Sequence, residues 1–266
     1  MKKKAYGILI IIMILLLPAC NPSRIVGKQT EPPMTTTPKS NDSDIEDIVS
    51  EKQQESIMIE YYSLLNKPNN KNQIIDFIDK NIEILDKENA NNMIINLEEY
   101  LSSNNYSFQE SYILLNRYKR YVSLETKSYI NILYTESSDS FIKEDNIIID
   151  LEDILNRGLV AENHMKVFSN GETKEKVSKM YKEYIKASII GVGNPYIYGE
   201  EGTSILKQEV FDIYNLIIEE NQSTKTRNIL FKYTKILQDN NRDMNSEEVN
   251  KFYDEIDSII EEELKK

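Results

Sequence analysis

Histidine and cysteine, which many enzymes use for proton transfer, nucleophilic attack and metal binding, are scarce in this sequence. Its 266 residues include one histidine, His164, and one cysteine, Cys20. A zinc site built on two or more histidines has no complete ligand set within the chain. His164 is therefore expected to be an inert residue on a helix. No catalytic residue, cofactor or metal site is predicted.

One stretch, residues 191–202, has the composition of a binding loop. It holds four of the eight glycines and the last proline, with tyrosines and acidic residues between them. Loops of this kind between rigid elements commonly carry binding residues, and about a dozen residues is long for a helix connection. The candidate binding residues are Gly191, Gly193, Asn194, Pro195, Tyr196, Tyr198, Glu200 and Glu201. The alternative is a long crossover whose tyrosines pack on the domain.

Ser204 and Lys207 have the S-x-x-K spacing of serine penicillin-binding enzymes, and Lys225-Thr226-Arg227 is similar to their K-T-G triplet. In those enzymes the triplet lies on a β-strand beside the helix that carries the serine. Here the triplet begins a stretch with helical periodicity. A chance similarity is therefore the better interpretation.

Residues 239–250 resemble the calcium-binding loop of an EF-hand, because oxygen-bearing side chains recur at alternate positions. Two positions depart from that pattern. Met244 stands where the sharp turn requires glycine, and Asn250 stands where a bidentate glutamate closes the site. The departures favour a polar turn between two helices, and weak calcium binding is the alternative.

Several acidic residues are adjacent in sequence: Glu98-Glu99, Glu219-Glu220 and Glu261-Glu262-Glu263. Adjacent side chains on a helix point about 100° apart, so they do not face each other as a catalytic pair does. These groups are interpreted as solvated helix faces. A glycosidase that brings two carboxylates together from distant positions is compatible with the sequence, but no residues are nominated for it.

The first twenty residues have the pattern of an export signal. Lys2, Lys3 and Lys4 precede an unbroken run of Ile, Leu and Met at 8–17, which is too short for a stable membrane span. Leu17-Pro18-Ala19-Cys20 then resembles the lipobox of bacterial lipoproteins. The resemblance implies alkylation of the Cys20 thiol with diacylglycerol, cleavage before Cys20, and a lipid anchor, with palmitate among its fatty acids, on the extracytoplasmic face of the cell membrane. The alternative is an uncleaved anchor.

Composition divides the chain into a signal peptide (1–19), a lipidated tether (20–43) and a domain (44–266), with a subdivision near 170 as an alternative. Proline, threonine and polar residues dominate the tether, which lacks the apolar residues needed to fold. The whole chain has a formal net charge of −12. Nucleic acid is excluded as a partner, because its phosphates require a basic surface.

Apolar residues in the domain recur at spacings of three and four, which is the pattern of amphipathic helices. The fold class predicted is all-α, an antiparallel bundle or irregular array of eight to ten helices without a significant sheet. Residues 147–149 and 196–198 are alternative short strands. The expected helices are 45–66, 72–87, 90–102, 108–122, 124–137, 147–169, 173–190, 204–220, 224–238 and 246–264.

Two classes of function follow from these observations. The first is a non-enzymatic lipoprotein that binds a protein, a peptide or a wall component at the cell envelope. The second is an envelope hydrolase whose carboxylates come together only in the folded chain. An enclosed cleft with two converging carboxylates would favour the hydrolase, and a convex or grooved helical surface would favour the binding protein.

Overall fold

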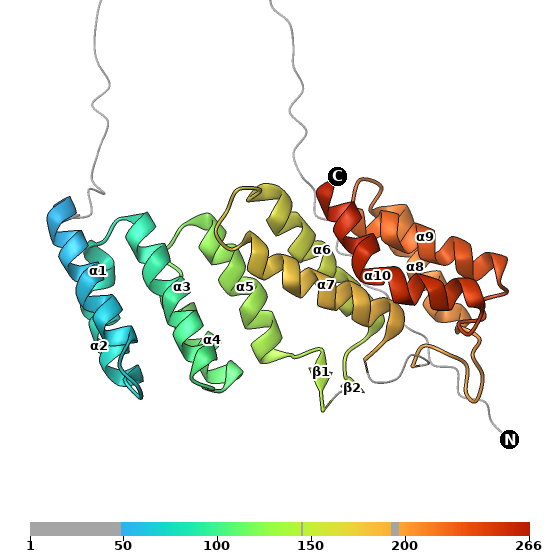
Figure 1. Ribbon diagram of the computed structural model, residues 1–266, viewed down its shortest axis with the longest axis horizontal. Helices are drawn as coiled ribbons and strands as arrows, with labels where there is room; N and C mark the ends of the chain where they lie inside the picture. Colours follow the sequence, from blue (N-terminus) through green and yellow to red (C-terminus); the bar gives the residue numbers. More distant parts are fainter. Residues whose placement is uncertain (1–48, 145, 193–196) are drawn as a thin grey trace, which may run out of the picture. The chain divides into compact units, whose positions relative to one another are not determined.

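A computed structural model describes residues 49–144, 146–192 and 197–266, and within these ranges the fold is all-α, as the sequence predicts (Figure 1). Ten α-helices and one hairpin of two short strands make up the regular structure of the described residues. The helices are α1 (Glu51–Leu65), α2 (Lys71–Asn81), α3 (Lys87–Ser103), α4 (Phe108–Asn116), α5 (Leu124–Ser138), α6 (Leu151–Val167), α7 (Lys174–Ile190), α8 (Gln208–Glu220), α9 (Lys225–Asp239) and α10 (Glu247–Lys265). A 3₁₀ turn, Ile82–Ile84, follows α2.

Burial of one apolar face accounts for these helices. In α10, Val249, Phe252, Ile256 and Ile260 are buried, while acidic residues cover the opposite face. The spacing of three, four and four residues brings these side chains to one side of the helix. The same apolar spacing occurs in the other predicted ranges, which match the observed helices. Burial against neighbouring helices therefore stabilises helical segments that are rich in Ile, Asn and Tyr.

Side-chain caps mark the start of five of the ten α-helices of the described residues. Ser107 caps α4, where its Oγ accepts a hydrogen bond of 3.3 Å from the Glu110 amide. The caps of α3, α5, α9 and α10 are Asp86, Ser123, Thr224 and Ser246. Each of these side chains accepts a hydrogen bond from a backbone amide in the first turn of its helix.

Several predicted helices were too long. The helices expected at 72–87 and 108–122 end at Asn81 and Asn116, and those expected from 147 and 204 begin at Leu151 and Gln208. Before α6, β1 (Ile142–Lys143) pairs antiparallel with β2 (Asn146–Ile147), so the alternative strand assignment is correct at Ile147 alone. Before α8, the chain is extended and makes β-bridges between Gly199 and Leu206 and between Ile205 and Asp243. Backbone pairing takes precedence over helical periodicity in both places.

The described residues belong to one compact unit, with no division near residue 170. Helices α1 to α7 pack on one another in chain order, and α6 also contacts α8 and α9 (Figure 1). The closest pairing is between α6 and α7, where Gly158 faces α7. A Cβ at Gly158 would lie 3.2 Å from the Ile185 Cδ1 atom. The small residue therefore permits the approach of the two helices. No helix of the described residues has the length and apolar character needed to cross a bilayer.

Candidate functional site

An open cavity of about 670 Å³ lies between α5 and α7. Side chains from α3, α4, α5, α7 and the chain around β1 form its walls, so the cavity exists only when these five segments are packed together. Its lining residues are Glu98, Tyr112, Tyr129, Leu133, Glu136, Ser137, Ser140, Phe141, Ile142, Lys176, Lys179, Met180, Glu183 and Tyr184.

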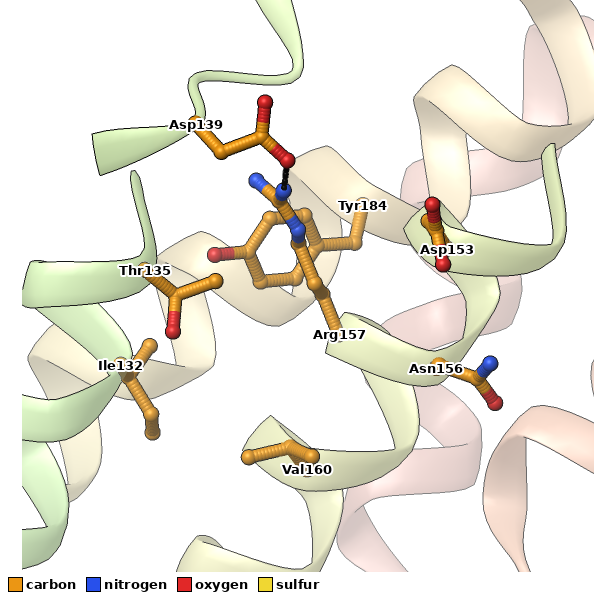
Figure 2. Close-up of a pocket in the computed structure, with 8 residues that line it drawn as sticks. All are labelled: Ile132, Thr135, Asp139, Asp153, Asn156, Arg157, Val160 and Tyr184. Carbon is orange, nitrogen blue, oxygen red and sulfur yellow. Dashed lines mark hydrogen bonds and ion pairs between the residues drawn. The ribbon is translucent and has the colours of Figure 1, made fainter. Parts of the chain in front are cut away.

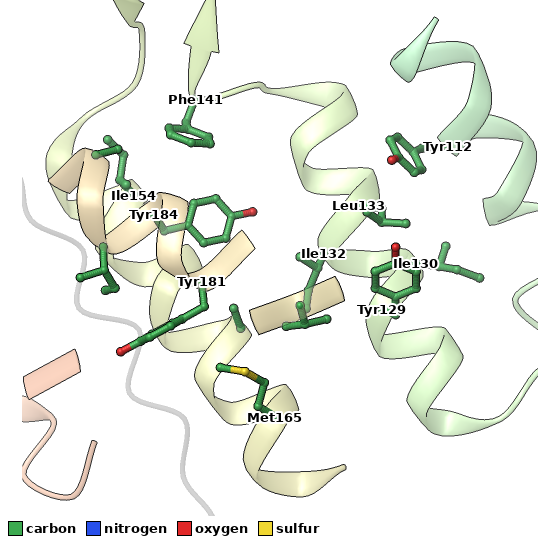
Figure 3. Close-up of a cluster of buried hydrophobic side chains, with 14 of the residues drawn as sticks. Tyr112, Tyr129, Ile130, Ile132, Leu133, Phe141, Ile154, Met165, Tyr181 and Tyr184 are labelled. Atoms are coloured by element: carbon green, nitrogen blue, oxygen red, sulfur yellow. The ribbon is translucent and has the colours of Figure 1, made fainter. Parts of the chain in front are cut away.

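Aromatic rings form much of the wall. Tyr112, Tyr129, Phe141 and Tyr184 are all buried, and the Phe141 and Tyr184 rings meet edge to face at 5.2 Å between centroids. In Figure 3 the Tyr184 hydroxyl points from α7 toward α5, and the Tyr112 and Tyr129 hydroxyls point toward each other beside Leu133. The cavity therefore offers apolar ring surface together with hydroxyl groups.

Glu136 is a buried carboxylate in this wall, and it holds α5, α6 and α7 together. Its Oε1 accepts hydrogen bonds of 2.6 Å from Arg157 and 2.8 Å from the Tyr184 hydroxyl. Arg157 also donates a hydrogen bond of 3.1 Å to Asp139. Arg157 and Asp139 line a second cavity of about 280 Å³ (Figure 2). The side chains of Glu136 and Arg157 are only 7% and 11% exposed, so this ion pair is almost fully removed from water.

Glu98 is the second carboxylate in the wall, and it connects α3 with α7. It accepts a hydrogen bond of 2.8 Å from Lys176 and another from Tyr129. Burial lowers the pKa of Lys176, but the hydrogen bonds from Lys176 to Glu98 and Glu99 outweigh burial and raise it overall. The expectation of a solvated face at Glu98-Glu99 is wrong for Glu98, whose side chain is only 12% exposed. Adjacent side chains on a helix point in different directions, and here Glu99 faces the solvent while Glu98 faces the cavity.

The tyrosine hydroxyls remain neutral donors. Burial, followed by the charge of Glu98, raises the pKa of both Tyr112 and Tyr129 well above the ordinary value. Burial, followed by Glu136, does the same for Tyr184. Tyr129 and Tyr184 already donate their single hydroxyl proton to Glu98 and Glu136, so towards a ligand these oxygens act as hydrogen-bond acceptors.

The mouth of the cavity carries one charge of each sign. Lys179 and Glu183 lie one turn apart on α7, are exposed, and form no ion pair with the described residues. Met180 lies between them and is partly buried against the core. An apolar interior with unpaired charges at its edge suits a molecule that has an apolar body and a charged end.

The structure places the predicted loop residues differently. Tyr198 is buried, and its hydroxyl donates a hydrogen bond of 2.9 Å to the carbonyl of Ala187 on α7, so it is a core residue and not a surface contact. Gly191 ends α7 with a φ of 71°, and Glu200 and Glu201 are exposed. Gly193, Asn194, Pro195, Tyr196 and Cys20 lie outside the described residues.

The residues of the two motif similarities make contacts within the fold. Ser204 lies in the extended segment before α8, and its Oγ donates a hydrogen bond of 2.6 Å to Asp243. Met244 is fully buried beneath the loop that resembles an EF-hand. Among the described residues no cluster of three or more His, Cys, Asp or Glu side chains is arranged to hold a metal ion.

His164 is part of a buried polar network that joins α5, α6 and α7. Its Nε2 and Nδ1 atoms lie 2.9 Å from Thr173 Oγ1 and from Ser128 Oγ. Thr173 donates its hydroxyl proton to Glu125 at 2.6 Å, so its oxygen accepts from the Nε2–H of His164. Neutral His164 therefore carries its proton on Nε2 and accepts from Ser128 at Nδ1. The imidazole is a satisfied structural group.

We expect the stability of the domain to fall in mild acid because of His164. Burial lowers the pKa of this imidazole below its ordinary value of 6.5, and the charge of Glu125 only partly opposes the shift. The unfolded chain then binds the proton more tightly, so the contribution is complete above pH 6.5 and is lost as the pH falls toward the folded-state pKa. Urea denaturation between pH 5 and 7.5 measures this, with His164→Gln as the reference. An equal pH dependence in both proteins would contradict it.

The aromatic cavity was not found from the sequence. Its residues are far apart along the chain, and each one occupies the apolar face of its own helix, where it is indistinguishable from a core residue. One signal was present, in that the chain has 17 tyrosines and no tryptophan. A tyrosine buried beside a glutamate cannot be recognised until the helices are placed.

No family model, curated protein or solved structure matches this chain.

Proposed function

We propose that this protein is a lipid-anchored, extracytoplasmic binding protein that holds a small amphipathic molecule in the cavity between α5 and α7. The observation that carries the proposal is the aromatic wall of Tyr112, Tyr129, Phe141 and Tyr184 with unpaired charges at its mouth. Ligand sites are typically concave and mostly apolar, with a few polar groups that fix orientation.

Each part of the ligand has a counterpart in the wall. The rings and the side chains of Leu133 and Met180 would contact the apolar body. Lys179 or Glu183 would pair with the charged end, which stays near the solvent. A volume of about 670 Å³ lies within the usual range of small-molecule sites.

A hydrolase is the second candidate, because Glu98 and Glu136 line the same cavity. A glycosidase uses one carboxyl group as a proton donor and the other as a nucleophile or base. Here Glu98 is bound to Lys176, and Glu136 to Arg157 and Tyr184, so each already holds a cation of the chain itself. Their hydrogen bonds join helices, and this favours a structural role over catalysis.

The anchor is tested by Cys20→Ser. Because a thiol is required for diacylglycerol transfer, this variant should incorporate no labelled palmitate and should remain uncleaved or be released from the membrane. Radiolabelled fatty acid followed by gel analysis measures the outcome. Persistent label on the variant would contradict the anchor, and it would leave the cavity proposal unaffected.

The cavity is tested by a matched pair of substitutions at the end of α5. Ser137 lines the cavity and Ser138 does not, although both hydroxyls donate to the same Tyr134 carbonyl. In residues 44–266, Ser137→Phe should weaken binding of the fluorescent probe anilinonaphthalene sulfonate at least tenfold, because the new ring occupies the cavity. Ser138→Phe should bind like the unaltered domain, and both should melt at nearly the same temperature.

The probe is suited to this cavity because it has an aromatic body and a charged end, and its fluorescence rises when it leaves water. A titration gives the dissociation constant. Equal binding by the Ser137→Phe and Ser138→Phe domains would place the probe elsewhere and count against the proposed site.

A further inference from the structure

A separate cavity of about 580 Å³ lies where α6 ends and where α7 and α9 begin. Four lysines line it: Lys166, Lys174, Lys225 and Lys266. This gathering stands out because the chain as a whole has a formal net charge of −12. The hydroxyl-bearing residues Ser169, Ser178 and Ser223 lie in the same wall.

Three of these lysines have no carboxylate partner among the described residues. Lys174 donates a hydrogen bond of 2.7 Å to the carbonyl of Ser169, and Lys225 donates one of 2.7 Å to the carbonyl of Glu263. Carbonyl groups are neutral, so these contacts fix the ammonium groups at the cavity edge without cancelling their charge. Lys166 is exposed at the last turn of α6 and forms no hydrogen bond or ion pair with the described residues.

The two carboxylates in the wall are already engaged. Glu162 accepts hydrogen bonds from the Lys225 and Thr226 amides and from the Thr226 hydroxyl. Glu263 binds Lys232 at 2.8 Å and Lys266 at 2.7 Å. Burial of Glu263 raises the pKa of its carboxyl group, but these hydrogen bonds outweigh burial and lower it to about 2. Glu263 is compensated by lysines, whereas the donors to Glu162 are neutral and leave its charge in place. The four lysines and two glutamates of the lining therefore leave an excess of two positive charges.

We propose that this cavity binds a phosphate ester, with Lys166, Lys174 and Lys225 as the charge partners of its oxygens. A phosphate group presents several strong acceptor oxygens around one centre and carries up to two charges, which suits ammonium groups converging from three helices. The serine hydroxyls can donate to the remaining oxygens. The start of α9 does not supply the site, because Glu162 and Thr224 already accept from its first amides.

The phosphate could be soluble or could belong to a lipid headgroup, and this site is independent of the one between α5 and α7. The full chain, purified in a nonionic detergent, is titrated calorimetrically with inorganic phosphate and with a short glycerol phosphate oligomer. The full chain with Cys20→Ser, which lacks the lipid anchor, is also tested for flotation with vesicles of phosphatidylglycerol and of phosphatidylcholine. The substitution prevents insertion of the lipid anchor into the vesicles from being mistaken for headgroup binding.

Wild-type protein should bind at least one phosphate probe saturably, and binding should weaken as salt rises. The double variant Lys166→Gln with Lys174→Gln should bind at least tenfold more weakly. Both lysines are exposed, so the fold should be retained. The control is Lys235→Gln with Lys251→Gln, which removes the same charge from two exposed lysines outside the cavity.

Binding of the soluble probes with no preference between the vesicles would identify a soluble phosphate ester. Binding confined to phosphatidylglycerol would identify a lipid headgroup. Absence of saturable binding to every probe would overturn the proposal. So would equal weakening in the two double variants, because that result would reflect net charge alone.

Discussion

Replacement of Arg157 by leucine is expected to lower the free energy of unfolding by about 3–5 kcal/mol. The guanidinium and the carboxylate of Glu136 are both almost completely buried, at 11% and 7% exposure. Removal of the cation leaves the carboxylate in the interior with only the Tyr184 hydroxyl as a partner. Loss of one member of a buried ion pair is costly because the charge that remains is no longer compensated. Urea denaturation followed by circular dichroism measures the change.

Arg117→Leu is the matched control. Arg117 makes an ion pair with Asp79 at a similar distance, 3.0 Å, but the two side chains are 53% and 40% exposed. Exposed pairs of this kind contribute about 0–1 kcal/mol, because water screens them. The double variant Arg157→Leu with Glu136→Leu should be more stable than Arg157→Leu alone. Similar losses for Arg157→Leu and Arg117→Leu would contradict the burial of the Glu136 pair.

The second large effect is expected for Glu162→Ala, which should cost about 3 kcal/mol, since it leaves the donors at the start of α9 without their acceptor. Those donors are the Lys225 amide at 2.5 Å, the Thr226 amide at 2.9 Å and the Thr226 hydroxyl at 2.8 Å. Thr226 is fully buried, so water cannot replace the carboxylate there. Glu162 therefore connects α6 to α9 as a cap supplied from another helix.

Glu152→Ala on the exposed face of the same helix is the comparison for Glu162→Ala. It removes a carboxylate from the first turn of α6, where the interaction with the helix dipole is worth about 0.3–1 kcal/mol. Thermal and urea unfolding should separate the two variants clearly. A loss at Glu162 no larger than the loss at Glu152 would show that the buried cap contributes little.

The sequence predicts the helices well, because amphipathic periodicity is a local property. The apolar spacing of Val249, Phe252, Ile256 and Ile260 can be recognised without knowing any neighbouring helix, and it matches α10. Predicted helix ends were less accurate where backbone pairing competes with the helix, as at the β-bridge of Ile205 with Asp243, which precedes the start of α8. Backbone pairing with a segment far along the chain does not alter the apolar periodicity of the sequence, so that periodicity cannot predict it.

The roles of acidic and aromatic side chains could not be predicted in the same way. Glu263 is buried and Glu98 is partly buried, and both are paired with lysines, while their neighbours Glu99 and Glu262 are more exposed. Sequence adjacency indicates that two such residues face different directions, but not which one faces the core. Tyr198 illustrates the same limit, because only the position of Ala187 on α7 makes it a buried hydrogen-bond donor.

The cavity between α5 and α7 depends on several of these buried interactions. Glu136 with Arg157 and Tyr184 fixes one side, and Glu98 with Lys176 and Tyr129 fixes the other. The ring surfaces and hydroxyls are therefore held in place before any ligand arrives. A preformed site loses less conformational entropy on binding, which favours affinity.

The most direct test of the central claim is to identify what the protein carries when it is isolated from cell envelopes. Full-length wild type, Ser137→Phe and Ser138→Phe are purified identically in mild detergent and denatured, and the released small molecules are measured by mass spectrometry. We predict that wild type and Ser138→Phe release the same amphipathic molecule, in an amount close to that of the protein, and that Ser137→Phe releases little of it. Equal release from all three proteins, or release of detergent alone from the wild type, would contradict a binding site between α5 and α7.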